Sequence, residues 1–392
     1  MKTNVAMMTK LNNFLSPTKI ILGNGAVSQV GDEAKKLGGK KALIVTDKGV
    51  VKAGLVSGVE ESLKAKKIDF GIFDKVAAEP PARIVDECAR VIREKGYDFV
   101  IGIGGGSSLD VAKGAAIVAV NGGKVLDYAG VDMVPCRGLP KILIATTAGT
   151  GSETTRVLVV TDEADKLKKA VHSDFNLADV AIVDPMMTMS MPLEVTADTG
   201  MDALVHAIEA YVSVSATPFS DILAIEAIRL IAENLSAAYA KGSNMEARFN
   251  MALAATLAGM AFTSGGLGIV HALSNPLGTE YHLTHGRSNA VMLPYVVDCN
   301  KIGNPNKYAR IAQAMGENIE PLSAYEAVER LVNSLLSLLE LLGIPSKIST
   351  YGVTKEDIPR LAAGAMKITR LFAWNPRDLT EEDVKGIYAA AF

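Results

Sequence analysis

The sequence predicts an α/β domain built on a parallel sheet, followed by an all-helical domain. In the first half, apolar runs of four to six residues, bounded by glycine, proline or charge, alternate with helical segments. This pattern is typical of a parallel sheet whose two faces are both covered. After Pro185 the runs stop, and apolar residues recur at three- and four-residue spacing. The chain has 392 residues, of which 49% are hydrophobic, enough for two domains. We therefore expect domains at 1–188 and 189–392.

The individual elements follow from the same two patterns. Buried strands are expected at 41–46, 70–73, 99–103, 141–145 and 181–183, and a helix is expected at 84–95. In the second half, helices are expected at 196–212, 220–240, 245–261, 324–342 and 359–369. The order of the strands and helices indicates a doubly wound first domain.

Charge and cysteine content narrow the class of protein. The net charge is −3, and no basic tract is present, which argues against a nucleic-acid partner. The three cysteines, Cys88, Cys136 and Cys299, lie far apart and form no CxxC pair, so neither a disulfide framework nor a thiolate zinc site is expected. The first residues contain no apolar core of a signal peptide. These features favour a cytoplasmic protein.

One long uncharged segment, 251–270, has the length of a membrane span. It contains hydroxyl residues and the flexible run Gly265-Gly266-Leu267-Gly268, and no second such segment exists. We interpret it as a buried helix and expect no membrane association.

A glycine-rich turn connects the expected strand 99–103 to a following helix. It reads Gly104-Gly105-Gly106-Ser107, and the helix begins near Leu109. Glycine lets the backbone approach a ligand, and a helix N-terminus offers unpaired N–H groups to a phosphate. The alternative is a tight strand-to-helix connection in which Ser107 caps the helix.

Further polar residues follow strand ends in the first domain. Asp47 ends the strand 41–46, where an acid can accept hydrogen bonds from a ribose; a turn aspartate is the alternative. Asp110 lies in the first helical turn, where it either contacts a cofactor or pairs with Lys113. After the strand 141–145 comes a second small-residue loop, whose hydroxyls can bind a nucleotide or simply form a turn. Its candidate residues are Thr146, Thr147 and Thr150.

Four residues of the second domain are candidate metal ligands. Asp202 and His206 are four residues apart and share one helix face, while His271 and His285 follow in a glycine-containing region. A carboxylate and three imidazoles form a complete shell for Fe²⁺, Zn²⁺ or similar ions. The alternative is a hydrogen bond between Asp202 and His206. His282 is a candidate for proton transfer or a surface residue.

Together these motifs resemble the iron-containing (group III) alcohol dehydrogenase family. The resemblance rests on GGGSSLDVAKGAA at 104–116, TTAGTGSE at 146–153, GMDALVHAIEAY at 200–211, HALSNPLG at 271–278 and THGRSNAVMLP at 284–294. NPRDLTEEDVKGIY at 375–388 and SPTKIILGNGA at 16–26 add to it, so nearly the whole chain is covered in order.

The resemblance implies a dehydroquinate synthase-like architecture with an N-terminal dinucleotide-binding domain, a C-terminal metal-binding domain and a site between them. Asp202, His206, His271 and His285 match the metal ligands, while Gly104, Gly105, Gly106, Ser107, Thr146, Thr147, Thr150 and Lys168 match the cofactor loops. Lys169 is the alternative to Lys168. Asp47 stands where NAD-preferring members carry an aspartate. Many members have a histidine where this chain has Asn275, which leaves His282 as the candidate for proton transfer.

The expected activity is interconversion of a small primary alcohol or diol with its aldehyde or ketone. The expected cofactors are NAD, with NADP as the alternative, and Fe²⁺, with Zn²⁺ or another divalent metal as the alternative. The expected catalytic residues are the four metal ligands together with His282, and the cofactor-binding residues form a separate group. Family members are commonly dimers or larger, so a homo-oligomer is expected. The alternatives are a hydroxyacid–oxoacid transhydrogenase, a dehydroquinate synthase-like lyase and a non-catalytic NAD-binding regulator.

Overall fold

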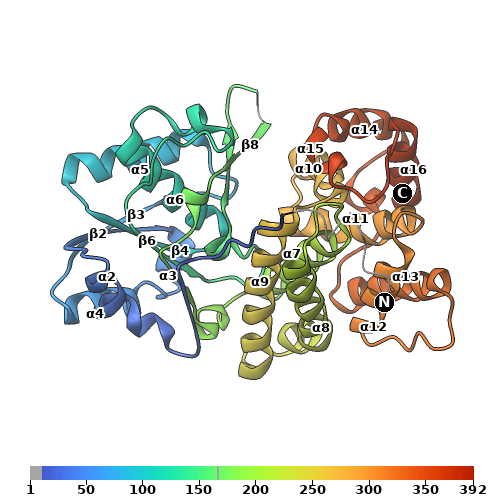
Figure 1. Ribbon diagram of the computed structural model, residues 1–392, viewed down its shortest axis with the longest axis horizontal. Coiled ribbons are helices and arrows are strands. Elements are labelled where there is room, and N and C mark those ends of the chain that lie inside the picture. The colour runs from blue at the N-terminus through green and yellow to red at the C-terminus, as the bar shows by residue number, and fades with distance from the viewer. Residues whose placement is uncertain (1–10, 166) are drawn as a thin grey trace. The chain divides into compact units, whose positions relative to one another are not determined.

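The computed structural model describes residues 11–165 and 167–392, which form two compact units (Figure 1). One unit spans Leu15–Ser190, and the other contains Met191–Phe392 together with the described residues 11–14. The boundary near Ser190 lies close to the one expected from the sequence. Residues 11–14, expected in the first domain, are instead grouped with the second, where the ring of Phe14 lies 5.3 Å from that of Phe219.

A six-stranded parallel sheet forms the centre of the first unit. Its strands have the order β1-β9-β6-β4-β2-β3. They are β1 (Lys19–Leu22), β2 (Lys41–Asp47), β3 (Asp69–Val76), β4 (Phe99–Gly104), β6 (Lys141–Ala145) and β9 (Val180–Val183). All adjacent pairs are parallel. This confirms the expected strands and the parallel sheet.

Both faces of this sheet are covered, as the apolar runs predict. Along β2, Leu43 and Val45 belong to one buried cluster, whereas Ala42 and Ile44 belong to another. Helices α5 (Ala82–Lys95) and α6 (Gly106–Asn121) cover the first face, and α2 (Val30–Lys36) and α4 (Ser57–Ala65) the second (Figure 1). The short helix α3 (Lys48–Lys52) follows β2.

A second, three-stranded sheet was not expected. Its strands are β5 (Gly130–Val131), β7 (Val157–Asp162) and β8 (Leu167–His172), in the order β5-β8-β7. Strand β8 carries Lys168, Lys169 and little apolar character, so periodicity does not reveal it. Its partner β7 contacts α6, where the buried Lys113 Nζ donates to the carbonyl of Val157 at 2.8 Å.

The second unit contains helices and no strands in its described residues. Its α-helices are α7 (Leu193–Val212), α8 (Pro218–Ala240), α9 (Met245–Gly265), α10 (Ile269–Tyr281), α11 (His285–Asn300), α12 (Pro305–Ala314), α13 (Ala324–Leu341), α14 (Ile358–Met366), α15 (Thr369–Ala373) and α16 (Glu381–Ala391). The five expected helices are present. The other helices, α10, α11, α12, α15 and α16, were not expected. Helices α10 and α11 each contain an internal proline, Pro276 and Pro294 respectively.

The uncharged segment 251–270 forms a helix that breaks. Helix α9 ends at Gly265, and α10 begins at Ile269 after a glycine turn in which Gly266 has φ 79°. In the described residues, no single helix has the length and apolar character of a membrane span, and the pair α9–α10 that meets those criteria together is bent by 111°. The buried-helix interpretation therefore holds for the part within α9.

Candidate metal centre and nucleotide loops

Three helices bring the four predicted metal ligands together. Asp202 and His206 lie on successive turns of α7, His271 in the first turn of α10, and His285 at the start of α11. Their ligand atoms all lie within 4.8 Å of one another. The four side chains converge on one point, although Asp202 and His285 are 83 positions apart in the sequence.

The start of α11 is fixed against α7 by a short polar network. Thr284 caps α11 by accepting from the Arg287 N–H, and its hydroxyl donates to Asp198 Oδ2 at 2.6 Å. Arg287 Nε donates to Asp198 Oδ1 at 2.5 Å. Gly286 packs directly on α7, because a Cβ there would lie 2.3 Å from the Asp198 carbonyl oxygen. This close approach places His285 beside Asp202.

The ligand set is largely buried. Asp202, His206 and His271 are buried, whereas the His285 side chain is 37% exposed. Burial alone would raise the pKa of Asp202, but His206, His285, His271 and a hydrogen bond from Asn289 outweigh it and hold the pKa below its usual value. The carboxylate is therefore ionised and available as a ligand.

A direct hydrogen bond between Asp202 and His206 does not explain this arrangement. The distance from His206 Nε2 to Asp202 Oδ1 is 3.9 Å, which is beyond hydrogen-bonding range. Instead, Asn289 Nδ2 donates to Asp202 Oδ1 at 2.8 Å and lies 3.2 Å from Nε2 of both His271 and His285. One carboxylate oxygen and three imidazole nitrogens thus surround one small volume. These atoms form a ligand set that fits a divalent transition metal.

Several neighbours of the ligands were missed by the sequence analysis. Glu209, one turn after His206 on α7, accepts from His271 Nδ1 at 2.6 Å, and the Phe262 ring lies 4.7 Å from the His206 ring. The spacing Asp202-His206-Glu209 along one face of α7 was the available signal for Glu209. Asn289 could have been found because it lies four residues after His285 on α11.

His282 lies outside the cluster of four. It is exposed and forms the C-cap of α10 with a left-handed backbone, φ 57°. Asn275 lies one turn after His271 on the same helix and is half-buried. The structure thus gives His282 no place among the ligands, and its role in proton transfer stays a prediction.

The glycine loop after β4 leads directly into α6. The helix begins at Gly106 with Gly105 as N-cap, and no side chain caps it. Ser107 lies inside the first turn, so the alternative in which Ser107 caps the helix is wrong. Ser108 N and Leu109 N donate to the Gly105 carbonyl, while no side chain caps this end of α6, which is the end of a helix that favours a phosphate.

Two glycines of this loop are required by close packing. Gly104 has φ 151°, and a Cβ there would lie 2.6 Å from the Ser108 side chain. At Gly106 a Cβ would lie 2.9 Å from Thr150 Cγ2. The threonine loop is therefore packed against the glycine loop, and Thr146 N donates to the Gly104 carbonyl at 3.0 Å. Thr147 faces Gly105 in the same way, with 3.5 Å between Cγ2 and the position of an added Cβ.

Asp47 lies beside the same loops, at the carboxyl end of β2. One carboxylate oxygen caps α3 by accepting from Val50 N at 3.0 Å, and the other accepts from the Ser108 hydroxyl at 3.2 Å. Asp47 therefore caps the helical turn after β2 and also lies next to the glycine loop.

Asp110 and Lys168 have partners within the protein. Asp110 accepts from Ser152 Oγ at 2.7 Å and from Val159 N at 2.9 Å, and its burial raises its pKa. Lys168 Nζ forms an ion pair with Glu79 at 2.6 Å. Asp110 thus connects α6 to the segment after the threonine loop. A cofactor contact by either residue remains a prediction.

Comparison with known proteins covers both units of the chain. The family model for iron-containing alcohol dehydrogenase matches residues 17–185, and that for the C-terminal part of the Fe-containing alcohol dehydrogenase family matches residues 196–392. Long-chain-alcohol dehydrogenase 1 of Geobacillus thermodenitrificans is 45% identical over 95% of this chain and 94% of its own. The NAD-dependent methanol dehydrogenase of Bacillus methanolicus is 43% identical, over 96% of this chain and 99% of its own.

A solved structure is also similar to this chain along nearly its whole length. The crystal structure of a 1,3-propanediol oxidoreductase superposes with a TM-score of 0.95 at 42% identity, over 98% of this chain and all of that one. The fold expected from the sequence, a dinucleotide-binding α/β domain followed by a helical metal-binding domain, is therefore confirmed. With family models matching nearly the whole chain and relatives above 40% identity, this chain belongs to the iron-containing alcohol dehydrogenase family.

Proposed function

We propose that this protein uses NAD and a divalent metal to interconvert a small primary alcohol or diol with its aldehyde or ketone. The observation that carries the proposal is the convergence of Asp202, His206, His271 and His285 within 4.8 Å. The named relatives act on long-chain alcohols, on methanol with NAD and on 1,3-propanediol, which supports an alcohol as substrate. Fe²⁺ is the proposed metal, with Zn²⁺ as the alternative.

Each group of residues has a separate task in this proposal. The four ligands hold the cation, which when bound supplies Lewis acidity toward an alcohol or carbonyl oxygen. The first turn of α6, with Gly104, Gly105, Gly106 and Ser107, binds the pyrophosphate of NAD, and Thr146, Thr147 and Thr150 line the same site. Asp47 accepts from the adenosine ribose and opposes a 2′-phosphate by charge repulsion. Asp110 and Lys168 are further candidate cofactor contacts, and His282 is the candidate proton carrier.

The metal assignment is tested by removing one ligand. His206→Ala removes one of four donors, so the purified variant reconstituted with Fe²⁺ or Zn²⁺ should retain far less metal and lose alcohol-dependent NADH formation. His172→Ala, on β8 of the other unit, is the matched control and should retain both. Full metal content and activity in His206→Ala would exclude this centre.

The reaction class is tested by a panel of alcohols and aldehydes with NAD(H) and NADP(H). Net accumulation of NADH from a simple alcohol supports a dehydrogenase. Turnover only when an oxoacid accepts the hydride, without free NADH, would instead indicate a transhydrogenase. We further propose that the protein is cytoplasmic and forms a homo-oligomer. Size-exclusion chromatography with light scattering tests the oligomeric state.

A further inference from the structure

Glu209 is a buried carboxylate on the metal-binding helix α7. It lies three residues after His206 and is 4% exposed. In the described part of the chain, the only ion pair it makes is with His271, and no lysine or arginine approaches within ion-pair distance. Because a buried carboxylate is costly unless it is paired or hydrogen-bonded, the contacts of Glu209 should account for its burial.

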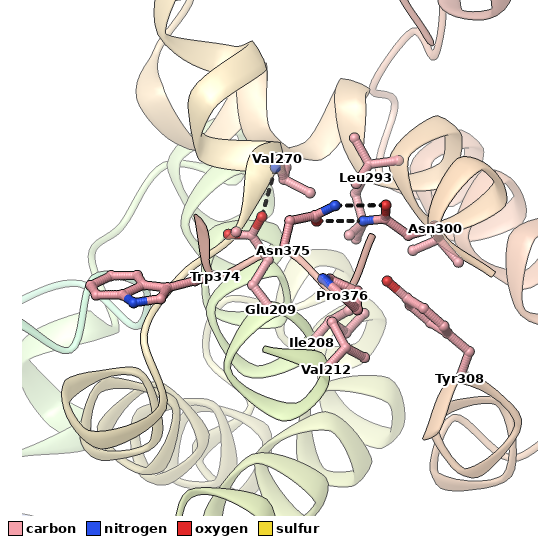
Figure 2. A pocket seen from close by; sticks show the side chains of 13 residues that line it. Ile208, Glu209, Val212, Val270, Leu293, Asn300, Tyr308, Trp374, Asn375 and Pro376 are labelled. Atoms are coloured by element: carbon pink, nitrogen blue, oxygen red, sulfur yellow. Dashed lines mark hydrogen bonds between the residues drawn. The ribbon is translucent and has the colours of Figure 1, made fainter. Parts of the chain in front are cut away.

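Both Glu209 oxygens are used at the N-terminus of α10. Oε1 accepts from Val270 N at 2.6 Å (Figure 2). Oε2 lies 2.6 Å from His271 Nδ1. Helix α10 has Gly268 as N-cap and no capping side chain of its own. Glu209 thus satisfies an unpaired N–H at the positive end of α10 while contacting a candidate ligand in the same turn.

Nearby polar groups do not compete for Glu209. Asn300 and Asn375 exchange side-chain hydrogen bonds of 2.7 and 2.9 Å beside it (Figure 2). A small cavity next to Glu209 is lined by these two residues, Tyr308 and apolar side chains. Gly268 gives the carboxylate room, because a Cβ there would lie 3.0 Å from Oε1.

The contacts on the two sides of the His271 ring imply the same tautomer. A carboxylate accepts only, so Nδ1 of a neutral His271 must carry the proton that it donates to Glu209. On the opposite side, Nε2 faces the Asn289 amide nitrogen, a donor, at 3.2 Å. Nε2 is therefore the unprotonated ring nitrogen, and it lies on the side of Asn289, whose amide also donates to Asp202.

We propose that Glu209 is a positioning residue for the metal centre: it fixes the Nδ1–H tautomer and the ring orientation of His271, so that Nε2 is held as a ligand. This rests on the proposed function in so far as the four-residue set binds a cation. Partners that orient a ligating histidine are worth roughly 10- to 100-fold in metal affinity.

The direct test is Glu209→Gln, which keeps size and shape but has one acceptor oxygen. That oxygen cannot serve both the Val270 N–H and the His271 Nδ1–H. If this oxygen keeps the hydrogen bond from the Val270 N–H, the amide NH₂ faces His271 Nδ1. The ring proton then moves to Nε2, where it blocks coordination. The dissociation constant for Co²⁺, measured by competition with a chromophoric chelator, should rise roughly 10- to 100-fold. The visible absorption spectrum of bound Co²⁺ should also change.

Two further variants separate positioning from general damage. Glu209→Asp keeps a carboxylate acceptor and should recover part of the affinity lost in Glu209→Gln. Glu226→Gln makes the same chemical change on α8, where Glu226 pairs with Arg229 away from the ligands, and should leave the Co²⁺ affinity unchanged. Circular dichroism of the metal-free proteins and NADH binding establish that each variant is folded.

A second measurement does not depend on any variant folding. Nitrogen NMR of isotope-labelled histidines in the metal-free wild-type protein reports which ring nitrogen carries the proton, and a chain with five histidines gives few signals to assign. His271 should show the Nδ1–H form. An Nε2–H tautomer, or wild-type Co²⁺ affinity in folded Glu209→Gln, would overturn the inference. If the wild-type protein binds no Co²⁺, the proposed metal centre fails as well, so the two failures are distinguishable.

Discussion

Replacing Lys141 by methionine should stabilise the protein, and the gain should depend on pH. Lys141 is the first residue of β6 and is 0% exposed. In the described residues, its Nζ has no hydrogen-bond partner. Burial lowers its pKa from 10.5 to about 8, while the nearby Asp179 carboxylate only partly compensates. Methionine has a similar length and no charge to desolvate.

The magnitude follows from the difference between the folded and unfolded pKa values. A lowering from 10.5 to about 8 corresponds to about 3 kcal/mol in the free energy of unfolding. Between these two pH values the unfolded chain binds a proton that the folded chain does not, so stability rises with pH. Below pH 8 both states are protonated and the full cost remains. Lys141→Met should therefore gain about 3 kcal/mol at pH 7 and much less at pH 10.

The assay is urea unfolding followed by far-UV circular dichroism at the two pH values. With an m-value of about 1–3 kcal/mol/M, the midpoint should rise by roughly 1–3 M at pH 7. Lys41→Met is the matched control, because Lys41 also begins a strand of the same sheet but donates from Nζ to the Lys95 carbonyl at 2.6 Å. It should give no gain. A Lys141→Met variant that is less stable than wild type at pH 7, or equally shifted at both pH values, would refute the reasoning.

Three further predictions concern the sites. Gly106→Val should weaken NADH binding at least tenfold by fluorescence titration, because its Cβ would lie 2.9 Å from Thr150 Cγ2; unchanged affinity would contradict the packing of the two loops. Asp47→Gly should raise the kcat/KM for NADP relative to NAD, since the repelling charge is lost, and an unchanged ratio would remove the reason for naming NAD. Gly286→Ala should lower both Tm and Co²⁺ affinity, because its Cβ would meet the Asp198 carbonyl at 2.3 Å; full metal affinity would show that α11 tolerates displacement from α7.

The parallel sheet was predictable because its strands are buried on both faces. In a chain whose strands and helices alternate, a continuous apolar run such as Ala42-Leu43-Ile44-Val45 indicates a strand that is buried on both faces. The second sheet was not predictable, since β8 presents Lys168 and Lys169 and is only partly buried. Helices α10 and α11 were hidden by glycine turns and internal prolines, which local propensity counts against a helix.

The candidate ligands were predictable, whereas their supporting residues were not. Histidine is rare in this chain, so His206, His271 and His285 stand out by residue type alone. Glu209 and Asn289 are common residue types, and their roles depend on which helices pack together. The alternative in which Ser107 caps the helix is wrong because the helix begins one residue before it and glycine occupies the cap position.

The origin of the ligands on α7, α10 and α11 also makes the cation a cross-link between chain segments that are distant in sequence. A ligand that binds only the folded state adds its binding free energy to stability, about 4 kcal/mol at a free concentration of about 1,000 times Kd. The melting temperature of the helical unit should thus follow cation supply. In a cell depleted of metal, this protein would face faster proteolysis as well as lost turnover, so its abundance would itself report metal status.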